Sequence, residues 1–190
     1  MFQPYKYHHI HSYFNTSKPF HFLHFFFHIA IVMAVITAEF EITSSLPAPT
    51  LFKIYNDFDT LAPKAEPETY KAVNIIEGDG GIGTIKSITY SDGLPFTNSK
   101  HKIDAVDSNN FSISFTVFEG DVLMGIIESG THHLKFLPSA DGGSVYKHSM
   151  VFKCKDDAKL TDDNVSLMKE GLKKSFKAVE AYIIAHPEAC

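Results

Sequence analysis

The sequence predicts an α+β fold in which a strongly bent antiparallel sheet wraps around one long C-terminal helix. Three observations predict it. Segments rich in β-branched and aromatic residues recur at short spacing over residues 70–154, and glycine and aspartate turns separate them. An apolar stripe at helical spacing follows near the C-terminus. Before the repeated strands, prolines frame two short helical segments that should close one end of the sheet.

The first part of the fold should be one strand followed by the two short helices. The strand is expected at residues 34–42, and the run Ser44-Ser45-Leu46-Pro47-Ala48-Pro49 breaks it. The helices are expected at residues 50–55 and 58–62. Pro63 and Pro67 should end this helical region.

Six further strands are expected at residues 70–77, 84–91, 99–106, 110–119, 122–137 and 144–154. Turn residues such as those at 91–93 and 141–143 separate them, as antiparallel hairpins require. Alternation in the fourth of these segments indicates which face is buried. Serine and threonine lie on one side, and the other side carries Phe111, Ile113, Phe115 and Val117.

The last element should be a helix that lies on the sheet. Its apolar stripe consists of Val165, Met168, Leu172, Phe176, Val179 and Ile183. Thr161 is a suitable N-cap, and Pro187 should stop the helix. Gly171, in mid-helix, suggests close packing or a bend. Periodicity cannot decide whether the interior is solid or holds a ligand cavity, and solid packing is the default expectation.

Composition excludes several functional classes. The chain has 190 residues, 44% of them hydrophobic and 21% charged, which fits one globular domain. All 17 basic residues are lysines and the net charge is −5, so no stable nucleic-acid complex is expected. Two cysteines, Cys154 and Cys190, are too few for a disulfide framework. We therefore expect a cytoplasmic location, with the nucleus as a second location.

The N-terminal 32 residues differ from the rest of the chain. They contain no Asp, Glu or Gly but hold six of the 11 histidines and seven of the 17 phenylalanines. Histidines interrupt the segment that would otherwise suit a signal peptide or a membrane span. We expect residues 1–32 to be a disordered extension or a gene-prediction artefact, with a targeting segment as the alternative. Residues 33–190 form the folded domain, for which we expect no membrane insertion, no metal and no cofactor.

A glycine-rich run at residues 77–86 is the most conspicuous motif. Its members Gly78, Asp79, Gly80, Gly81 and Gly83 match the spacing of a dinucleotide fingerprint. That motif requires a following helix, whereas residues 84–90 read as a strand, and the residues after Gly83 also exclude a Walker loop. The run therefore predicts a hairpin between two strands.

Residues 33–190 resemble a known family, the class-ten plant pathogenesis-related proteins that include the major birch pollen allergen, Bet v 1. Three stretches carry the resemblance: the glycine run at residues 77–86, the strand at residues 100–107, and the end of the helix at residues 178–187. The resemblance implies a helix-grip fold with a seven-stranded curved sheet and a large internal hydrophobic cavity. This implication replaces the expectation of a solid interior.

The resemblance also implies ligands and lining residues. Family members bind cytokinins, flavonoids, sterols and similar amphipathic molecules in the cavity, and many are induced in defence. The residues that would line it here are Phe111, Ile113, Phe115, Phe136, Tyr146, Phe152, Leu172, Phe176 and Tyr182. Each is also a natural core residue.

Other family-related functions are weaker alternatives. A ribonuclease activity is reported for the family, and its proposed residues correspond to Lys86, Glu128, Glu180 and Tyr182. Related hormone receptors of abscisic-acid signalling inhibit protein phosphatases through a gate loop, which residues 91–95 loosely resemble, but their His-Arg latch is missing. Condensing enzymes of alkaloid synthesis share the fold, although no complete catalytic set is found here.

We therefore interpret the chain as a non-enzymatic, monomeric, defence-related binding protein for small hydrophobic or amphipathic plant metabolites or hormones. His132 and His133 should point to opposite faces of a strand rather than form a metal pair. The sequence does not name the ligand.

Overall fold

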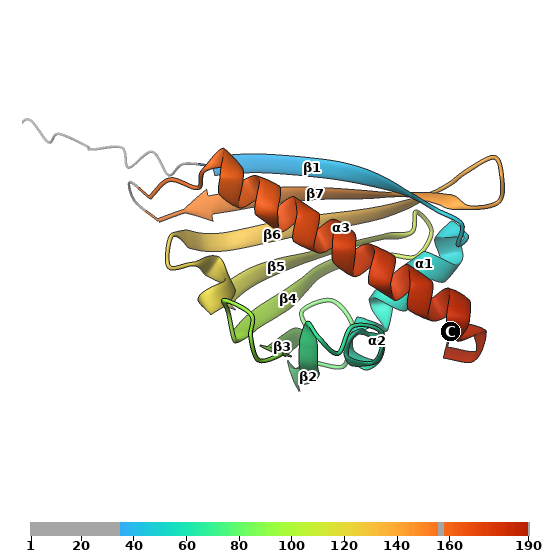
Figure 1. The fold of residues 1–190 in the computed structure, drawn as a ribbon, viewed down its shortest axis with the longest axis horizontal. Helices are drawn as coiled ribbons and strands as arrows, with labels where there is room; N and C mark the ends of the chain where they lie inside the picture. Colours follow the sequence, from blue (N-terminus) through green and yellow to red (C-terminus); the bar gives the residue numbers. More distant parts are fainter. Residues whose placement is uncertain (1–34, 156–157, 190) are drawn as a thin grey trace, which may run out of the picture. The chain divides into compact units, whose positions relative to one another are not determined.

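The structure is a computed structural model that describes residues 35–155 and 158–189 (Figure 1). The expected extension at residues 1–32 and the residue Cys190 lie outside the described residues. The elements in chain order are β1 (Val35–Ser44), α1 (Ala48–Asn56), α2 (Phe58–Ala65), β2 (Tyr70–Glu77), β3 (Ile85–Tyr90), β4 (Asn98–Asp107), β5 (Ser112–Gly120), the 3₁₀ turn η1 (Asp121–Leu123), β6 (Ile127–Pro138), β7 (Ser144–Cys154), α3 (Asp162–Ala185) and the 3₁₀ turn η2 (Pro187–Ala189).

The strands form one antiparallel, seven-stranded sheet in the order β1-β7-β6-β5-β4-β3-β2. Strands β2 to β7 follow one another as a meander, and β1 pairs with β7 from Val35↔Lys153 to Ser44↔Ser144. Hairpin turns explain the meander because neighbouring strands are joined by short connections rich in glycine and aspartate. The predicted α+β helix-grip fold is confirmed.

Helix α3 runs across the sheet, and its C-terminal end lies beside α1 and α2 (Figure 1). Thr161 caps its N-terminus as predicted, since its side chain accepts a hydrogen bond from the backbone amide of Asn164 at 3.2 Å. The helix ends at Ala185, before Pro187. The apolar stripe faces inward, where Phe176, Val179 and Ile183 are buried.

Two predicted boundaries are wrong. The segment expected as one strand at residues 122–137 begins as the 3₁₀ turn η1, and β6 starts only at Ile127. Met124 and Gly125 adopt φ angles of 54° and 70°, which no strand accommodates. In α2, Pro63 lies inside the helix rather than ending it. The helix continues because Pro63 forfeits only its own amide, while Glu66 still donates to the carbonyl of Ala62 at 2.9 Å.

The close packing expected at Gly171 is not found. A Cβ atom added at this glycine would meet nothing within 4 Å, and the residue is exposed. Neither close packing nor a positive φ angle therefore requires a glycine at this position.

The main core lies between the inner face of the sheet, α1 and α3, and a small second cluster, Ala62, Val73 and Ile88, lies under α2. The alternation predicted for β5 is confirmed, since Ile113 and Val117 are buried. No helix within residues 35–155 and 158–189 has the length and apolar character needed to cross a bilayer.

Candidate functional site

The interior beneath α3 has two different halves. At the C-terminal half of the helix, which we call the closed half, four aromatic rings fill the space between helix and sheet. Phe176 of α3 stacks on Tyr146 of β7 with ring centroids 4.6 Å apart, and Tyr146 stacks on Phe136 of β6 at 5.3 Å. Tyr55 of α1 joins them, 5.2 Å from Phe136. Pairs of this geometry exclude water and fix the helix on the sheet.

At the N-terminal half of α3, which we call the open half, the facing side chains are incompletely covered. Val165, Met168 and Leu172 pack against the core but stay only partly buried. On the inner face of the sheet, Phe115 is also partly buried, whereas Phe152 is buried. Large apolar side chains of both the helix and the sheet thus retain accessible area.

A groove of about 500 Å³ lies between this half of α3 and the edge of the sheet. Its lining residues are Thr37, Ala38, Glu39, Ser149, Met150, Val151, Val165 and Lys169. Ala38, Met150, Val151 and Val165 are its apolar lining residues, and Glu39 and Lys169 are its charged ones. We call this feature the α3 groove.

The predicted lining residues divide between the two halves. Phe136, Tyr146 and Phe176 belong to the closed half, and Ile113 is buried on the sheet nearby. Phe115, Phe152 and Leu172 belong to the open half. The remaining two occupy the periphery: the ring of Phe111 lies 5.9 Å from Phe52, and Tyr182 stacks on His186 at 4.4 Å.

Sequence reasoning missed the interior histidines. His101, His132 and His148 project from the inner faces of β4, β6 and β7, among the apolar side chains. Burial, followed by the neighbouring histidine His132 and by Lys86, lowers the pKa of His101 to about 3. Burial is also the main reason why the pKa values of His132 and His148 fall to about 4 and about 2. All three are therefore neutral near pH 7.

Strand alternation could have revealed one of them. His132 and His133 do point to opposite faces, since His132 is buried while His133 is exposed and hydrogen-bonds Ser114 Oγ through Nδ1 at 2.8 Å. No group of three potential metal ligands lies together anywhere in residues 35–155 and 158–189.

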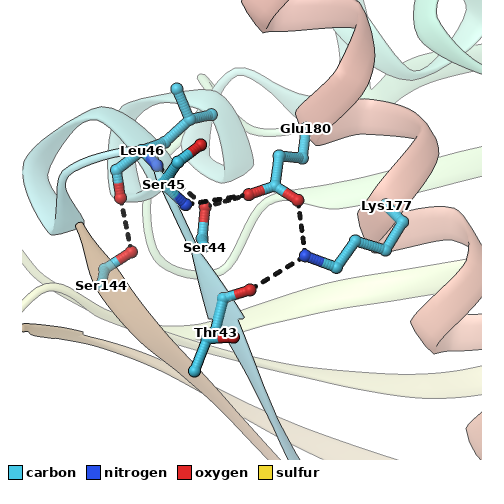
Figure 2. Close-up of polar contacts among 7 residues, drawn as sticks. All are labelled: Thr43, Ser44, Ser45, Leu46, Ser144, Lys177 and Glu180. Carbon is cyan, nitrogen blue, oxygen red and sulfur yellow. Dashed lines mark hydrogen bonds and ion pairs between the residues drawn. The ribbon is translucent and has the colours of Figure 1, made fainter.

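Glu180 joins α3 to the end of β1. Its Oε1 accepts hydrogen bonds from Ser44 Oγ at 2.5 Å and from the amide of Ser45 at 3.2 Å, and its Oε2 accepts one from Lys177 Nζ at 2.6 Å (Figure 2). Lys177 also donates to the carbonyl of Thr43. Burial raises the pKa of Glu180, but the hydrogen bonds from Lys177 and Ser44 outweigh this and lower it overall. This carboxylate serves as a structural tie.

The other residues of the ribonuclease alternative lie elsewhere. Lys86 is buried on β3 and its Nζ pairs with Asp59 Oδ1 of α2 at 3.1 Å. Glu128 is exposed near the start of β6, at the Cys154 end of β7, whereas Glu180 contacts the Ser144 end. These ends are separated by roughly 30 Å at ~3.3 Å per strand residue. The two carboxylates are too far apart to act on one phosphodiester.

The glycine run forms the predicted hairpin between β2 and β3. Gly78 has a φ angle of 92°, and a Cβ there would lie 2.6 Å from Thr84 Oγ1. Three loop amides find partners within the protein: Gly80 N donates to Thr84 Oγ1, Gly81 N to Asp79 Oδ1, and Gly83 N to the carbonyl of Ile103. The loop thus supplies its own hydrogen-bond acceptors.

The loop between β3 and β4, which contains the gate-like residues 91–95, is tied to the start of η1 through Thr97. Both carboxylate oxygens of Asp121 accept from Thr97 N, at 2.9 and 2.8 Å, and one accepts from Asn98 N at 3.0 Å. These hydrogen bonds lower the pKa of Asp121. Gly120 is required beside it, because a Cβ there would lie 2.3 Å from the carbonyl oxygen of Asn98.

Comparisons with known proteins cover nearly the whole described domain. A family model described as the pathogenesis-related protein Bet v 1 family matches residues 33–186. A root allergen protein of Taraxacum officinale is 82% identical over 154 residues, which cover 80% of this chain and 98% of that protein. The major strawberry allergen Fra a 1.04 of Fragaria ananassa is 44% identical over 156 residues, or 82% of this chain and 98% of the allergen.

Solved structures agree with the fold. The crystal structure of Ara h 8.0201 aligns with a TM-score of 0.71 at 37% identity, covering 80% of this chain and all of that one. Norcoclaurine synthase from Thalictrum flavum, in complex with dopamine and hydroxybenzaldehyde, aligns with a TM-score of 0.65 over 93% of this chain and 98% of the synthase. At 19% identity, the second likeness concerns the fold alone.

Proposed function

The chain belongs to the pathogenesis-related Bet v 1 family, and from that membership we propose that it is a carrier or sensor of small amphipathic molecules. Cytokinins, flavonoids and sterols are the ligand classes that the family resemblance implies. The ligand would lie between the inner face of the sheet and the N-terminal half of α3. Its role would be defence-related, as the naming of its relatives as pathogenesis-related proteins suggests.

The observation that carries this proposal is the contrast in coverage within one interior. The closed half is sealed by stacked rings, whereas Phe115 of the sheet and Leu172 of α3 are only partly buried. Uncovered apolar area inside a fold forfeits about 25 cal/mol for each Å² left in contact with water. An apolar ligand would recover that free energy.

The α3 groove supports the same location. Its volume of about 500 Å³ falls within the range typical of small-molecule sites, roughly 300–1,000 Å³. Apolar residues with a few polar groups at the rim suit a ligand that has one polar end. Lys169 and Glu39 supply such groups.

Ligand displacement tests the proposal. The full-length protein should change the fluorescence of a hydrophobic dye on binding, and kinetin, naringenin or a plant sterol should displace the dye. A panel of such ligands that causes no displacement, together with an unchanged melting temperature in their presence, would refute the carrier function.

Two tryptophan variants place the site. Val165→Trp should fill the α3 groove and weaken dye binding about tenfold or more. Leu167→Trp puts the same side chain two residues away on the outer face, where Leu167 is 72% exposed, and should leave dye binding unchanged. Equal effects of the two substitutions would contradict this location.

A further inference from the structure

One aromatic sandwich crosses three strands of the open half. The ring of Phe115 lies between two imidazoles, with centroids 5.2 Å from His101 and 4.8 Å from His132. The rings are nearly parallel, at interplanar angles of 6° and 4°. Register produces the stack, because Phe115 and His132 are directly paired between β5 and β6. The sandwich fixes the orientation of the His132 ring.

A chain of hydrogen bonds ends on the same histidine. Tyr146 Oη lies 2.8 Å from His148 Nδ1, and His148 Nε2 lies 2.8 Å from His132 Nδ1. Each neutral imidazole carries one N–H. If Tyr146 donates to His148, then His148 donates to His132, whose Nε2 is a donor. If His148 donates to Tyr146 instead, Nε2 of His132 is an acceptor. The free end of the chain can thus take either role.

The last atom of this hydrogen-bond chain, Nε2 of His132, is not completely buried. Within the described residues, Nε2 of His132 makes no hydrogen bond, whereas Nδ1 makes one. No side-chain nitrogen or oxygen of those residues is both fully buried and without a partner. Nε2 must therefore keep some accessible surface, in agreement with the 8% exposure of His132. It is a polar atom on the inner face of the sheet that has no hydrogen-bond partner among the described residues.

Gly130 keeps the approach to this nitrogen open. It lies on the inner face of β6, two residues before His132, and its φ angle is not in the left-handed region. A Cβ at this position would lie 3.2 Å from the ring of Phe152 and 3.6 Å from Nε2 of His132. The backbone conformation does not require a glycine here, but the close approach of the Phe152 ring does. A glycine inside a strand often marks a place where another group approaches closely.

We propose that Nε2 of His132, with the His101–Phe115–His132 stack beside it, forms a subsite for a neutral hydroxyl group on an aromatic or alicyclic ligand. This inference rests on the proposed carrier function and specifies its ligand class. A hydroxyl group both donates and accepts, so it matches either state of the hydrogen-bond chain. The apolar ring that carries it would lie against Phe115 and Phe152.

A carboxylate is the wrong partner for the same atoms. The three histidines carry no charge near neutral pH, and Lys86, whose charge acts on His101, is already paired with Asp59 at 3.1 Å. An anion buried without a compensating charge is strongly disfavoured. The subsite should therefore select a hydroxyl over a carboxylate on the same ring system.

Three naphthalenes test this selection on the full-length protein at pH 7. We expect 2-naphthol to bind about tenfold more tightly than 2-methoxynaphthalene, which cannot donate, and more tightly than 2-naphthoate. His132→Phe should abolish the preference while 2-methoxynaphthalene still binds. His133→Phe, the same change on the outward-facing neighbour, should preserve it.

Nitrogen NMR tests the same contact in the protein without any substitution. In ¹⁵N-histidine-labelled protein, 2-naphthol should shift the Nε2 resonance of His132, and 2-methoxynaphthalene should not. Equal affinities with no shift would overturn the subsite and leave the carrier function standing. If 2-naphthoate bound more tightly than the other two naphthalenes, that result would also overturn the subsite. Binding of none of the three would refute both the subsite and the carrier function.

Discussion

The two halves of the interior under α3 differ in how their polar groups are used. In the closed half, Glu180 satisfies Ser44, Ser45 and Lys177, and stacked rings occupy the remaining space. In the open half, a hydrogen-bond chain ends on a nitrogen of His132 that has no partner in the described part of the chain, among side chains that remain partly uncovered. The same helix thus holds the fold together at its C-terminal half and leaves a polar group free to bind a ligand at its N-terminal half.

This contrast indicates that the closed half provides stability and the open half provides the proposed binding site. The contacts of the closed half are complete without any ligand, so they can hold α3 on the sheet in the free protein. The open half can then remain incompletely packed without loss of the fold. Substitutions in the two halves should therefore affect different measurements.

The largest effect should come from the closed half. Phe176→Ala removes a buried ring that stacks on Tyr146 at 4.6 Å, and should lower the free energy of unfolding by about 4 kcal/mol. Leu172→Ala, one turn earlier and only partly buried, should cost about half as much. Urea unfolding measures both. Equal losses would show that the two halves are packed alike.

Glu180→Ala should cause the next largest loss of stability. It leaves the buried Ser44 hydroxyl and the Ser45 amide without their acceptor, and should cost about 2–3 kcal/mol. Dye binding should stay the same once the variant is folded, because the carboxylate lies in the closed half. Thermal unfolding followed by a binding titration checks both points. Loss of dye binding at full folding would place Glu180 in the ligand site.

Acid should destabilise the open half through its histidines. The folded-state pKa values of His132 and His148, about 4 and about 2, lie below the unfolded value of 6.5. The unfolded chain therefore binds more protons, and stability present above pH 6.5 is lost as the pH falls. At pH 5 each histidine should cost about 2 kcal/mol.

Denaturant unfolding at pH 7, 6 and 5 measures this dependence. His132→Asn should reduce the slope of stability against pH by about 1.4 kcal/mol per unit near pH 5. His133→Asn, on the exposed face, is the matched control and should keep the wild-type slope. An unchanged slope in His132→Asn would mean that His132 is protonated in the folded protein.

The smallest effect should occur at the boundary between the halves. Gly171→Ala meets no atom within 4 Å and should stabilise the protein by about 1 kcal/mol through helix propensity. If ligand binding remains normal, the glycine has no mechanical role. Weaker binding in a more stable variant would instead show that α3 bends at Gly171 to admit the ligand.

Much of the fold could be predicted because its signals are local. The stripe from Val165 to Ile183 predicts α3, and Thr161 and Pro187 predict its ends, since capping and helix termination depend on a few neighbouring residues. The η1 turn could not be predicted from hydrophobic pattern. Its residues Asp121, Val122 and Leu123 resemble a strand start, but Asp121 instead binds the distant amides of Thr97 and Asn98.

Less of the site could be predicted from the sequence, because it also depends on contacts between residues that are distant in the chain. The predicted apolar lining residues follow from alternation within single strands. The histidine chain, by contrast, joins β6 to β7, and its meaning depends on the distances between His132, His148 and Tyr146. A histidine at an inward position was visible in the alternation of β6, but its partners were not. Register between strands decides them.

The hairpin at residues 77–86 has a consequence for motion. Because Asp79 and Thr84 accept hydrogen bonds from Gly81 and Gly80, and Ile103 accepts one from Gly83, the loop is held in place from within. The amides of Gly80, Gly81 and Gly83 should exchange with deuterium more slowly than free amides, and at the same rate with and without a ligand. Despite four glycines, this loop is a fixed rim of the domain, so any movement that admits a ligand has to occur elsewhere.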